Sequence, residues 1–226
     1  MLNVHLQGAG MRVHSVPSLV AAAVMLLASS IPVRAQDSLQ RRGWLALGLG
    51  TGVADIACQG DGCTSGWKLH GPTLLATVGL MLTPHVGLGL GLDQWWRSPS
   101  DSEATNTGTV ILHYYPSVRA GAFVEVGAGL SRAEVRLDGG KTAEGRRWAL
   151  MVGVGYEARV LRFERTDGIY DVTLTPRVSY VYSAIGDLTY AAGRPPFASG
   201  WRHQVLSAGL GVGLTFRHDC LFRATC

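Results

Sequence analysis

The chain has 226 residues, of which 47% are hydrophobic and 16% charged, with 20 basic against 16 acidic side chains. This length accommodates one domain or a small pair. The nearly balanced charge does not provide the clustered basic face of a nucleic-acid-binding protein, so we expect no nucleic-acid partner.

The first segment has the features of a secretory signal peptide. Arg12 precedes the apolar run "SLVAAAVMLLASSI", which ends in "PVRAQ". A basic flank, an apolar core of about 7–15 residues and small residues before the cut are typical of such a peptide. Val33 and Ala35 occupy the small-residue positions. We therefore predict that residues 1–35 are a signal peptide cleaved after Ala35, with Met11 as an alternative start.

Export would make the four cysteines candidates for disulfide bonds, because exported proteins meet an oxidising compartment. Cys58 and Cys63 flank the short polar segment "QGDG", and Cys220 and Cys226 lie near the C-terminus. Neither pair has the two-residue spacing that zinc sites favour. We expect no metal site and no cofactor.

The rest of the chain alternates with a period of two residues, as β-strands with two different faces do. In "VGLGLGLDQWW", Val86, Leu88 and Leu90 alternate with glycines. Similar glycine-rich stretches recur along the chain, and no helical pattern follows them as a phosphate-binding loop requires. They are therefore better interpreted as repeated strands. Eight strands are predicted, at about 43–54, 67–82, 86–97, 108–116, 121–137, 146–158, 169–183 and 203–216.

The two faces of these predicted strands differ in polarity. One face is a continuous apolar band, and the other consists mostly of Gly, Ser and Thr with isolated charges. An apolar exterior around a small, polar interior is typical of a barrel in a bilayer, where only ring closure satisfies the strand backbones. We predict an all-β fold, a closed antiparallel up-and-down transmembrane β-barrel of eight strands.

Two further patterns favour the same fold. Odd-numbered connections include the longest, 55–66 and 184–202, as long outer loops should, although the sixth connection, 159–168, is longer than a tight turn. Tryptophans and one phenylalanine fall at or near predicted strand ends, where aromatic rings form girdles at the membrane interfaces. The predicted interface aromatics are Trp44, Trp67, Trp95, Trp96, Trp148, Trp201 and Phe216.

Residues 42–216 resemble the small eight-stranded outer-membrane β-barrel proteins of the OmpA/OmpX-type superfamily. The resemblance lies in the "GLG" strands, "HYYP" (113–116), "LTPRVSY" (174–180) and the last strand, "LSAGLGVGLTF". It implies a bacterial outer-membrane location and a last strand, ending at Phe216, that is read by the barrel-assembly machinery. The family usually ends at that aromatic residue, whereas this chain continues as a predicted short periplasmic tail, residues 217–226. The predicted barrel domain is 36–216.

Four charged residues fall on the small-residue face: Asp93, Glu125, Glu157 and Arg177. Barrels of eight strands have interiors filled by side chains, and buried charges there must be paired. We therefore expect Arg177 to pair with Glu125 or Glu157 in an interior plug. The same charges would serve a gated pore.

We expect no enzymatic activity. Some barrels of this size modify lipid A, but a hydrolase needs a nucleophile, a base and an orienting acid within reach of one another. His203 and Ser207 share one face of a strand but lie about 13 Å apart at ~3.3 Å per residue. No convincing nucleophile lies near His113 in the sequence.

The sequence thus favours an integral outer-membrane protein with a filled lumen and a structural or surface-interaction role. Its expected partners are outer-membrane lipid and lipopolysaccharide, with the assembly machinery during biogenesis, and we favour a monomer. One alternative is a narrow porin or a conduit for small hydrophobic ligands. Another is a soluble periplasmic lipocalin-like binder, whose apolar faces would point inward around a ligand.

Overall fold

The computed structural model describes seven stretches of the chain: residues 43–59, 69–97, 103–117, 120–136, 142–165, 168–190 and 198–217. The predicted signal peptide lies outside them, as does the predicted tail beyond Arg217. Every regular element in these stretches is a β-strand. The strands are β1 (Gly43–Gln59), β2 (Leu69–Met81), β3 (Val86–Trp96), β4 (Glu103–Tyr114), β5 (Ala122–Arg136), β6 (Thr142–Tyr156), β7 (Ala158–Arg165), β8 (Gly168–Tyr190) and β9 (Ala198–Arg217).

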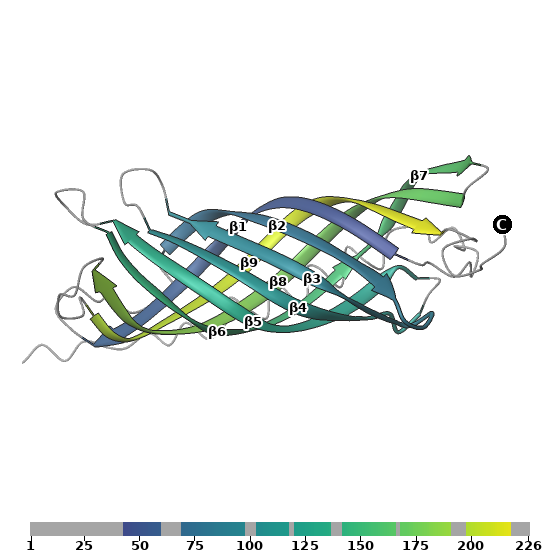
Figure 1. The fold of residues 1–226 in the computed structure, drawn as a ribbon. Helices are drawn as coiled ribbons and strands as arrows, with labels where there is room; N and C mark the ends of the chain where they lie inside the picture. Colours follow the sequence, from purple (N-terminus) through teal and green to yellow (C-terminus); the bar gives the residue numbers. More distant parts are fainter. Residues whose placement is uncertain are drawn as a thin grey trace, which may run out of the picture. The chain divides into compact units, whose positions relative to one another are not determined.

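The strands pair with their neighbours in an antiparallel ring (Figure 1). Strands β1 to β6 pair consecutively, β1 pairs with β9, and β9 pairs with β8. Pairing of β6 with β8 closes the ring. The predicted closed antiparallel barrel is therefore confirmed. No helix in the described stretches is long and apolar enough to cross a membrane.

Strand β7 explains why nine strands form an eight-membered ring. It follows β6 after a single residue, Glu157, and pairs with the Gly168–Leu174 half of β8. The other half of β8, Arg177–Tyr190, pairs with β6. Strands β6 and β7 thus together form one side of the ring, and the β7–β8 hairpin continues past its neighbours in Figure 1. The expectation of a connection over 159–168 is wrong: most of it is strand, and only residues 166–167 separate β7 from β8.

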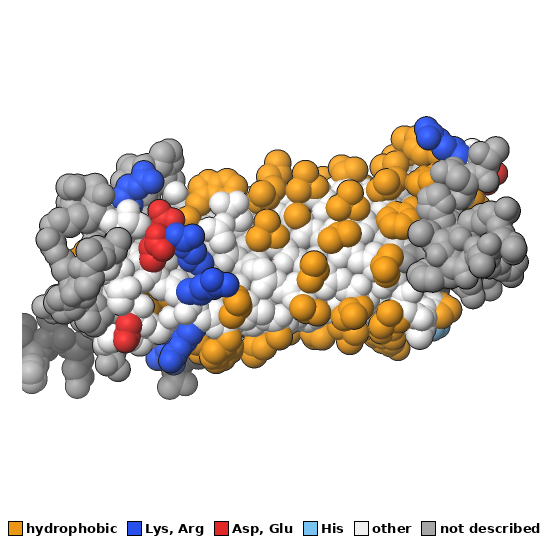
Figure 2. Space-filling view, viewed as in Figure 1, with side chains coloured by type: hydrophobic (Ala, Val, Ile, Leu, Met, Phe, Trp, Pro, Cys, Tyr) orange, Lys and Arg blue, Asp and Glu red, His pale blue; other side chains and the backbone are white. Residues whose placement is uncertain are grey.

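The apolar face of the strands points outward. Leu45, Leu47 and Leu49 are 53%, 59% and 65% exposed, and the same alternation continues around the ring. In Figure 2 hydrophobic side chains cover much of the middle of the visible barrel surface, and charged side chains lie toward the ends, most of them at the left. The lipocalin-like alternative is therefore wrong, because it needs these leucines inside the barrel.

Several strands extend further than the sequence pattern predicts. Strand β1 continues to Gln59, β8 continues to Tyr190 and β9 begins at Ala198, all within segments expected to be loops. The inward side chains of these extensions pack together at this end of the barrel. The extended ends of the strands therefore have a hydrophobic core of their own. This end cluster consists of Ala54, Ile56, Leu69, Trp95, Ala133, Ala143, Ile185, Leu188, Trp201 and Val205.

Some of the recurrent glycines are needed because neighbouring backbones approach closely. A Cβ atom on Gly129 in β5 would overlap the carbonyl oxygen of Gly108 in β4, and one on Gly50 in β1 would overlap that of Ala208 in β9. Glycine in a strand often marks this kind of approach. These glycines therefore have a structural role, and close approach of neighbouring strands explains why glycine recurs along the chain.

We predict that Gly129→Ala destabilises the barrel by about 1–3 kcal/mol, because the added methyl group meets backbone atoms that cannot move aside cheaply. The measurement is the midpoint of urea unfolding of the refolded protein. Gly108→Ala is the matched control, since a Cβ there meets nothing within 4 Å. Equal midpoints for the two variants would contradict the close-approach argument.

Candidate functional site in the barrel lumen

The lumen is lined mainly by hydroxyl groups between two apolar or aromatic ends. Hydroxyls from adjacent strands bond each other, such as Thr107 to Ser131 at 2.9 Å and Ser179 to Ser207 at 2.8 Å. Such pairs satisfy groups that would otherwise be buried without partners. A lumen cavity lined by Thr77, Glu125 and Arg177 has a volume of about 30 Å³, which is room for one or two water molecules.

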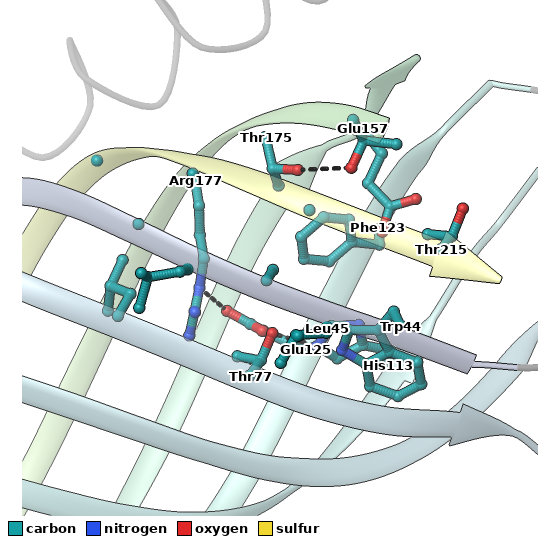
Figure 3. Close-up of a pocket in the computed structure, with 18 residues that line it drawn as sticks. Trp44, Leu45, Thr77, His113, Phe123, Glu125, Glu157, Thr175, Arg177 and Thr215 are labelled. Carbon is teal, nitrogen blue, oxygen red and sulfur yellow. Dashed lines mark hydrogen bonds and ion pairs between the residues drawn. The ribbon is translucent and has the colours of Figure 1, made fainter. Parts of the chain in front are cut away.

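Four ionisable side chains meet in the middle of the lumen, and Figure 3 shows three of them, Arg177, Glu125 and His113. The Arg177 Nε of β8 forms an ion pair with Glu125 Oε1 of β5, and Arg177 Nη2 lies 3.8 Å from Asp93 Oδ2 of β3. His113 Nε2 of β4 lies 3.0 Å from the other Glu125 oxygen. All four residues are at least nine-tenths buried. One cationic side chain is therefore flanked by two carboxylates in a space with little water. We call these residues the lumen ion cluster.

Small residues make room for this cluster. Arg177 pairs across the sheet with Gly155 on one side and Gly209 on the other. Glu125 pairs with Gly153, where a Cβ would overlap the Glu125 carboxylate. Arg177 therefore has glycine on both sides in the sheet, and Glu125 has glycine on one side and His113 on the other.

An aromatic layer lies next to the lumen ion cluster. The His113 ring lies between Trp44, with centroids 4.7 Å apart, and Phe123, with centroids 4.9 Å apart. Tyr115 packs beside Phe123 and donates its hydroxyl proton to Glu157 Oε1 at 3.0 Å. Stacked rings of this size fill the lumen end and fix the imidazole against Glu125.

The structure brings together three of the four charged residues expected in the lumen. Arg177 lies against Glu125 and close to Asp93, whereas Glu157 is bonded to Tyr115. Glu157, in the break between β6 and β7, is 6% exposed and so keeps the inward direction expected from its alternation with Gly155, although its printed hydrogen bond is to Tyr115. His113 was not expected in this cluster. Its signal was present, because it alternates with Leu112 and Tyr114 and so belongs to the inward face.

Three of the expected interface aromatics point into the lumen instead. Trp44, Trp95 and Trp201 are 3%, 2% and 7% exposed. The expectation that they contact the membrane interface is wrong, because large rings near strand ends are needed to fill the two ends of the lumen. Each of these tryptophans lies an even number of residues from inward-facing residues of its strand, as Trp95 lies two residues after Asp93.

The remaining expected aromatics behave differently. Trp148 is exposed on the outer face and packs beside Tyr182, with ring centroids 5.5 Å apart. Phe216 pairs across the sheet with Tyr170, which pairs with Phe163, so three aromatics form one row over β9, β8 and β7. Trp96 is half-buried, and Trp67 lies outside the described residues.

The candidate disulfides lie outside what the structure describes. Cys63, Cys220 and Cys226 are not among the described residues, and of Cys58 only the backbone in β1 is described. The pairing therefore stays a prediction.

His113 and His203, the histidines considered for catalysis, both have structural partners. His113 contacts Glu125. His203 Nδ1 lies 3.0 Å from Thr105 Oγ1, and Ser207 bonds Ser179 rather than a base. Within the described stretches no three His, Cys, Asp or Glu side chains come together as a metal site would require.

A closed antiparallel ring, apolar outside and polar inside, defines the class of membrane-spanning β-barrels. The chain belongs to the outer membrane protein β-barrel family, whose model, described as "Outer membrane protein beta-barrel domain", matches residues 21–216. Its location is the bacterial outer membrane.

Several solved structures are similar to the chain. They include the neisserial surface protein A (NspA), 18% identical with a TM-score of 0.47 over 74% of this chain and 96% of that one. Ail, the attachment invasion locus protein of Yersinia pestis, is 12% identical with a TM-score of 0.45, covering 76% and 99%. The N-terminal β-barrel domain of Pseudomonas aeruginosa OprF is 15% identical with a TM-score of 0.37, covering 78% and 98%. No curated protein matches the chain.

We predict that Arg177→Met destabilises the barrel by about 3 kcal/mol, because it leaves the Glu125 and Asp93 carboxylates without their cation. The double variant Arg177→Met/Glu125→Gln should recover part of that loss. The measurement is the temperature at which the folded form converts to the unfolded form on a denaturing gel.

The control for this prediction is Arg132→Met, which breaks an ion pair to Glu144 whose side chains are about half exposed. Exposed pairs contribute little, so the shift should be small. An unchanged conversion temperature for Arg177→Met would overturn the role assigned to the lumen ion cluster.

Proposed function

We propose that the protein is a closed outer-membrane barrel with a structural or surface-interaction role, without catalytic activity and without an open channel. The observation that carries this proposal is the filling of the lumen, where the cavity beside Arg177 and Glu125 has a volume of only about 30 Å³. A permeable channel needs a continuous water-filled path, and narrow barrels of eight strands are usually filled by side chains.

Two barriers in series support a closed lumen. The lumen ion cluster occupies the middle, with Arg177 held between Glu125 and Asp93. Beyond it, toward the longer connections, lies the apolar end cluster with Trp95 and Trp201. An ion crossing this end would lose its water shell without gaining polar partners, which costs several kcal/mol or more.

The expected partners follow from this role. The outer face of the barrel presents an apolar band to lipid. The row of Phe163, Tyr170 and Phe216 lies at the end of the barrel away from the longer connections, where it would contact the periplasmic interface of the membrane. We propose outer-membrane lipid and lipopolysaccharide as the standing partners, with the assembly machinery acting on the last strand during biogenesis, and a monomer as the functional unit. Any ligand on the cell surface would be met by the connections at the outer end.

A narrow gated pore is the second candidate, and one observation favours it. Arg177 has two carboxylates within reach, Glu125 in contact and Asp93 at 3.8 Å. A cation with two alternative partners can have two arrangements of similar energy, one of which could open the middle of the lumen. The apolar end cluster would still have to rearrange for ions to pass, so we favour the closed form.

We predict that the refolded protein gives no steady ionic current in planar bilayers. Trp95→Ala/Trp201→Ala should raise the current, because it removes the largest side chains of the apolar end cluster. Trp148→Ala is the control, since Trp148 lies on the outer face. A steady current through the wild-type protein, abolished or altered by Arg177→Met, would overturn the closed form and establish the pore.

A further inference from the structure

A small cavity beside Asp93 is surrounded by oxygen atoms from four strands. Its volume is about 10 Å³, about the space of one water-sized sphere. Trp95, Val181 and Val205 form its apolar walls. Five buried polar side chains also line it: Thr73 of β2, Asp93 of β3, Thr105 and Thr107 of β4, and Ser207 of β9. We call this space the oxygen-lined cavity.

Asp93 is the charged member of the oxygen-lined cavity, and the protein compensates its charge poorly. The side chain is 8% exposed, and within the described stretches its Oδ2 atom accepts no hydrogen bond. Arg177 Nη2 lies 3.8 Å from that oxygen, while the Nε of the same side chain contacts Glu125. His113 also bonds Glu125 and not Asp93. One arginine therefore serves two carboxylates, and Asp93 has the weaker share of it.

Three of the four hydroxyl groups can turn lone pairs toward the cavity, because each has an acceptor elsewhere for its proton. These acceptors are His203 Nδ1, 3.0 Å from Thr105, the Ser131 hydroxyl, 2.9 Å from Thr107, and the Ser179 hydroxyl, 2.8 Å from Ser207. A hydroxyl that donates its proton in this way keeps its oxygen free to accept. The cavity can therefore present several oxygen lone pairs around one carboxylate.

The fourth hydroxyl, on Thr73, is an independent sign of a missing ligand. Thr73 is 3% exposed, and within the part of the chain that the structure describes its Oγ1 atom has no hydrogen-bond partner. A buried polar atom without a partner costs free energy and is rare in folded proteins. Both Thr73 and Asp93 line the same cavity. A single occupant can thus serve both unpartnered groups.

We infer that the oxygen-lined cavity binds a monovalent metal cation, sodium, through the Asp93 carboxylate and the surrounding hydroxyl oxygens. Hard cations are bound by oxygen ligands, and a single positive charge balances a single carboxylate. Magnesium usually keeps several of its own water molecules, for which a cavity of this size has no room. A water molecule alone would bridge the oxygens but leave the charge on Asp93 uncompensated.

The bound ion has a structural role. It compensates the buried Asp93 carboxylate, which otherwise costs several kcal/mol, and it leaves Arg177 to Glu125. It also connects β9 to β2, β3 and β4 through the lumen, although β1 lies between β9 and β2 in the sheet. The site differs from one made of several His, Cys, Asp or Glu side chains, because four of its five polar groups are hydroxyls. The inference goes beyond the closed-lumen proposal and does not depend on it.

The test compares the temperature at which the folded form converts to the unfolded form on a denaturing gel, for protein refolded and equilibrated in sodium chloride or choline chloride. Equal concentrations of the two salts match the ionic strength, so general screening is the same in both. An ion that binds only the folded form raises the conversion temperature. We expect wild type to convert about 3–6 °C higher in sodium chloride.

Two variants assign this difference to the oxygen-lined cavity. Asp93→Asn should abolish the difference between the salts, because it removes the charge that binds the ion. Thr73→Val should reduce the difference and lower the conversion temperature in sodium chloride. If the Thr73 hydroxyl bound nothing, replacing it by a methyl group would be neutral or stabilising. Thr109→Val is the matched control, since Thr109 Oγ1 is also buried without a partner but does not line this cavity.

Equal conversion temperatures of wild type in the two salts would overturn the inference, because an Asp93 that is protonated or bonded to water does not respond to sodium. An unchanged sodium effect in Asp93→Asn would overturn it as well, by placing the effect elsewhere. Should Asp93→Asn fail to fold, the comparison of Thr73→Val with Thr109→Val decides, and equal sodium effects in these two variants would contradict the site. None of these measurements concerns bilayer conductance, so failure here is distinguishable from failure of the closed-lumen proposal.

Discussion

The structure depends on closing the hydrogen-bond ring of the sheet. In hydrocarbon an unpaired backbone N–H or C=O costs several kcal/mol, so a sheet edge cannot be left exposed to lipid. The last pairing of the ring, between β6 and β8, is what removes the edge. The short hairpin β7–β8 follows from the same constraint, since β8 is longer than β6 and the remaining half of β8 needs β7 as its partner.

Closing so few strands leaves a narrow interior, and the narrowness determines which residues can line it. The long side chains of Arg177, Glu125 and His113 in the lumen each have at least one glycine neighbour in the sheet. Arg177 between Gly155 and Gly209 is the clearest case. The glycine repeats and the buried charges are therefore two parts of one packing arrangement, in which short residues supply the volume that long ones occupy. Threonine and serine complete it by bonding each other between adjacent strands on the lumen side, as Thr107 does with Ser131.

Period-two alternation was sufficient to predict the barrel and the direction of most side chains, because alternation is a local property of each strand. The same alternation puts Trp44, Trp95 and Trp201 on the inward face of their strands. Their position at strand ends pointed to the membrane interface instead, and the alternation was the better guide. Partners across the barrel are different. Arg177 on β8 meets Glu125 on β5, although β6 lies between these strands in the sheet, and that contact depends on strand tilt and register around the whole ring. Strand β7 escaped detection because "ARVLRFER" has charges at irregular intervals, and its pairing irregularity between Arg159 and Leu161 interrupts the alternation.

The division of the tryptophans between lumen and lipid has an optical consequence. Trp44, Trp95 and Trp201 are enclosed by protein, whereas Trp148 is exposed on the outer face of the barrel. A fluorescence quencher carried on a lipid chain can approach Trp148 but is kept from Trp44, Trp95 and Trp201 by the barrel wall. These four tryptophans therefore contribute two separable signals to the emission, one that reports on the surrounding membrane and one that reports on the packing of the barrel interior.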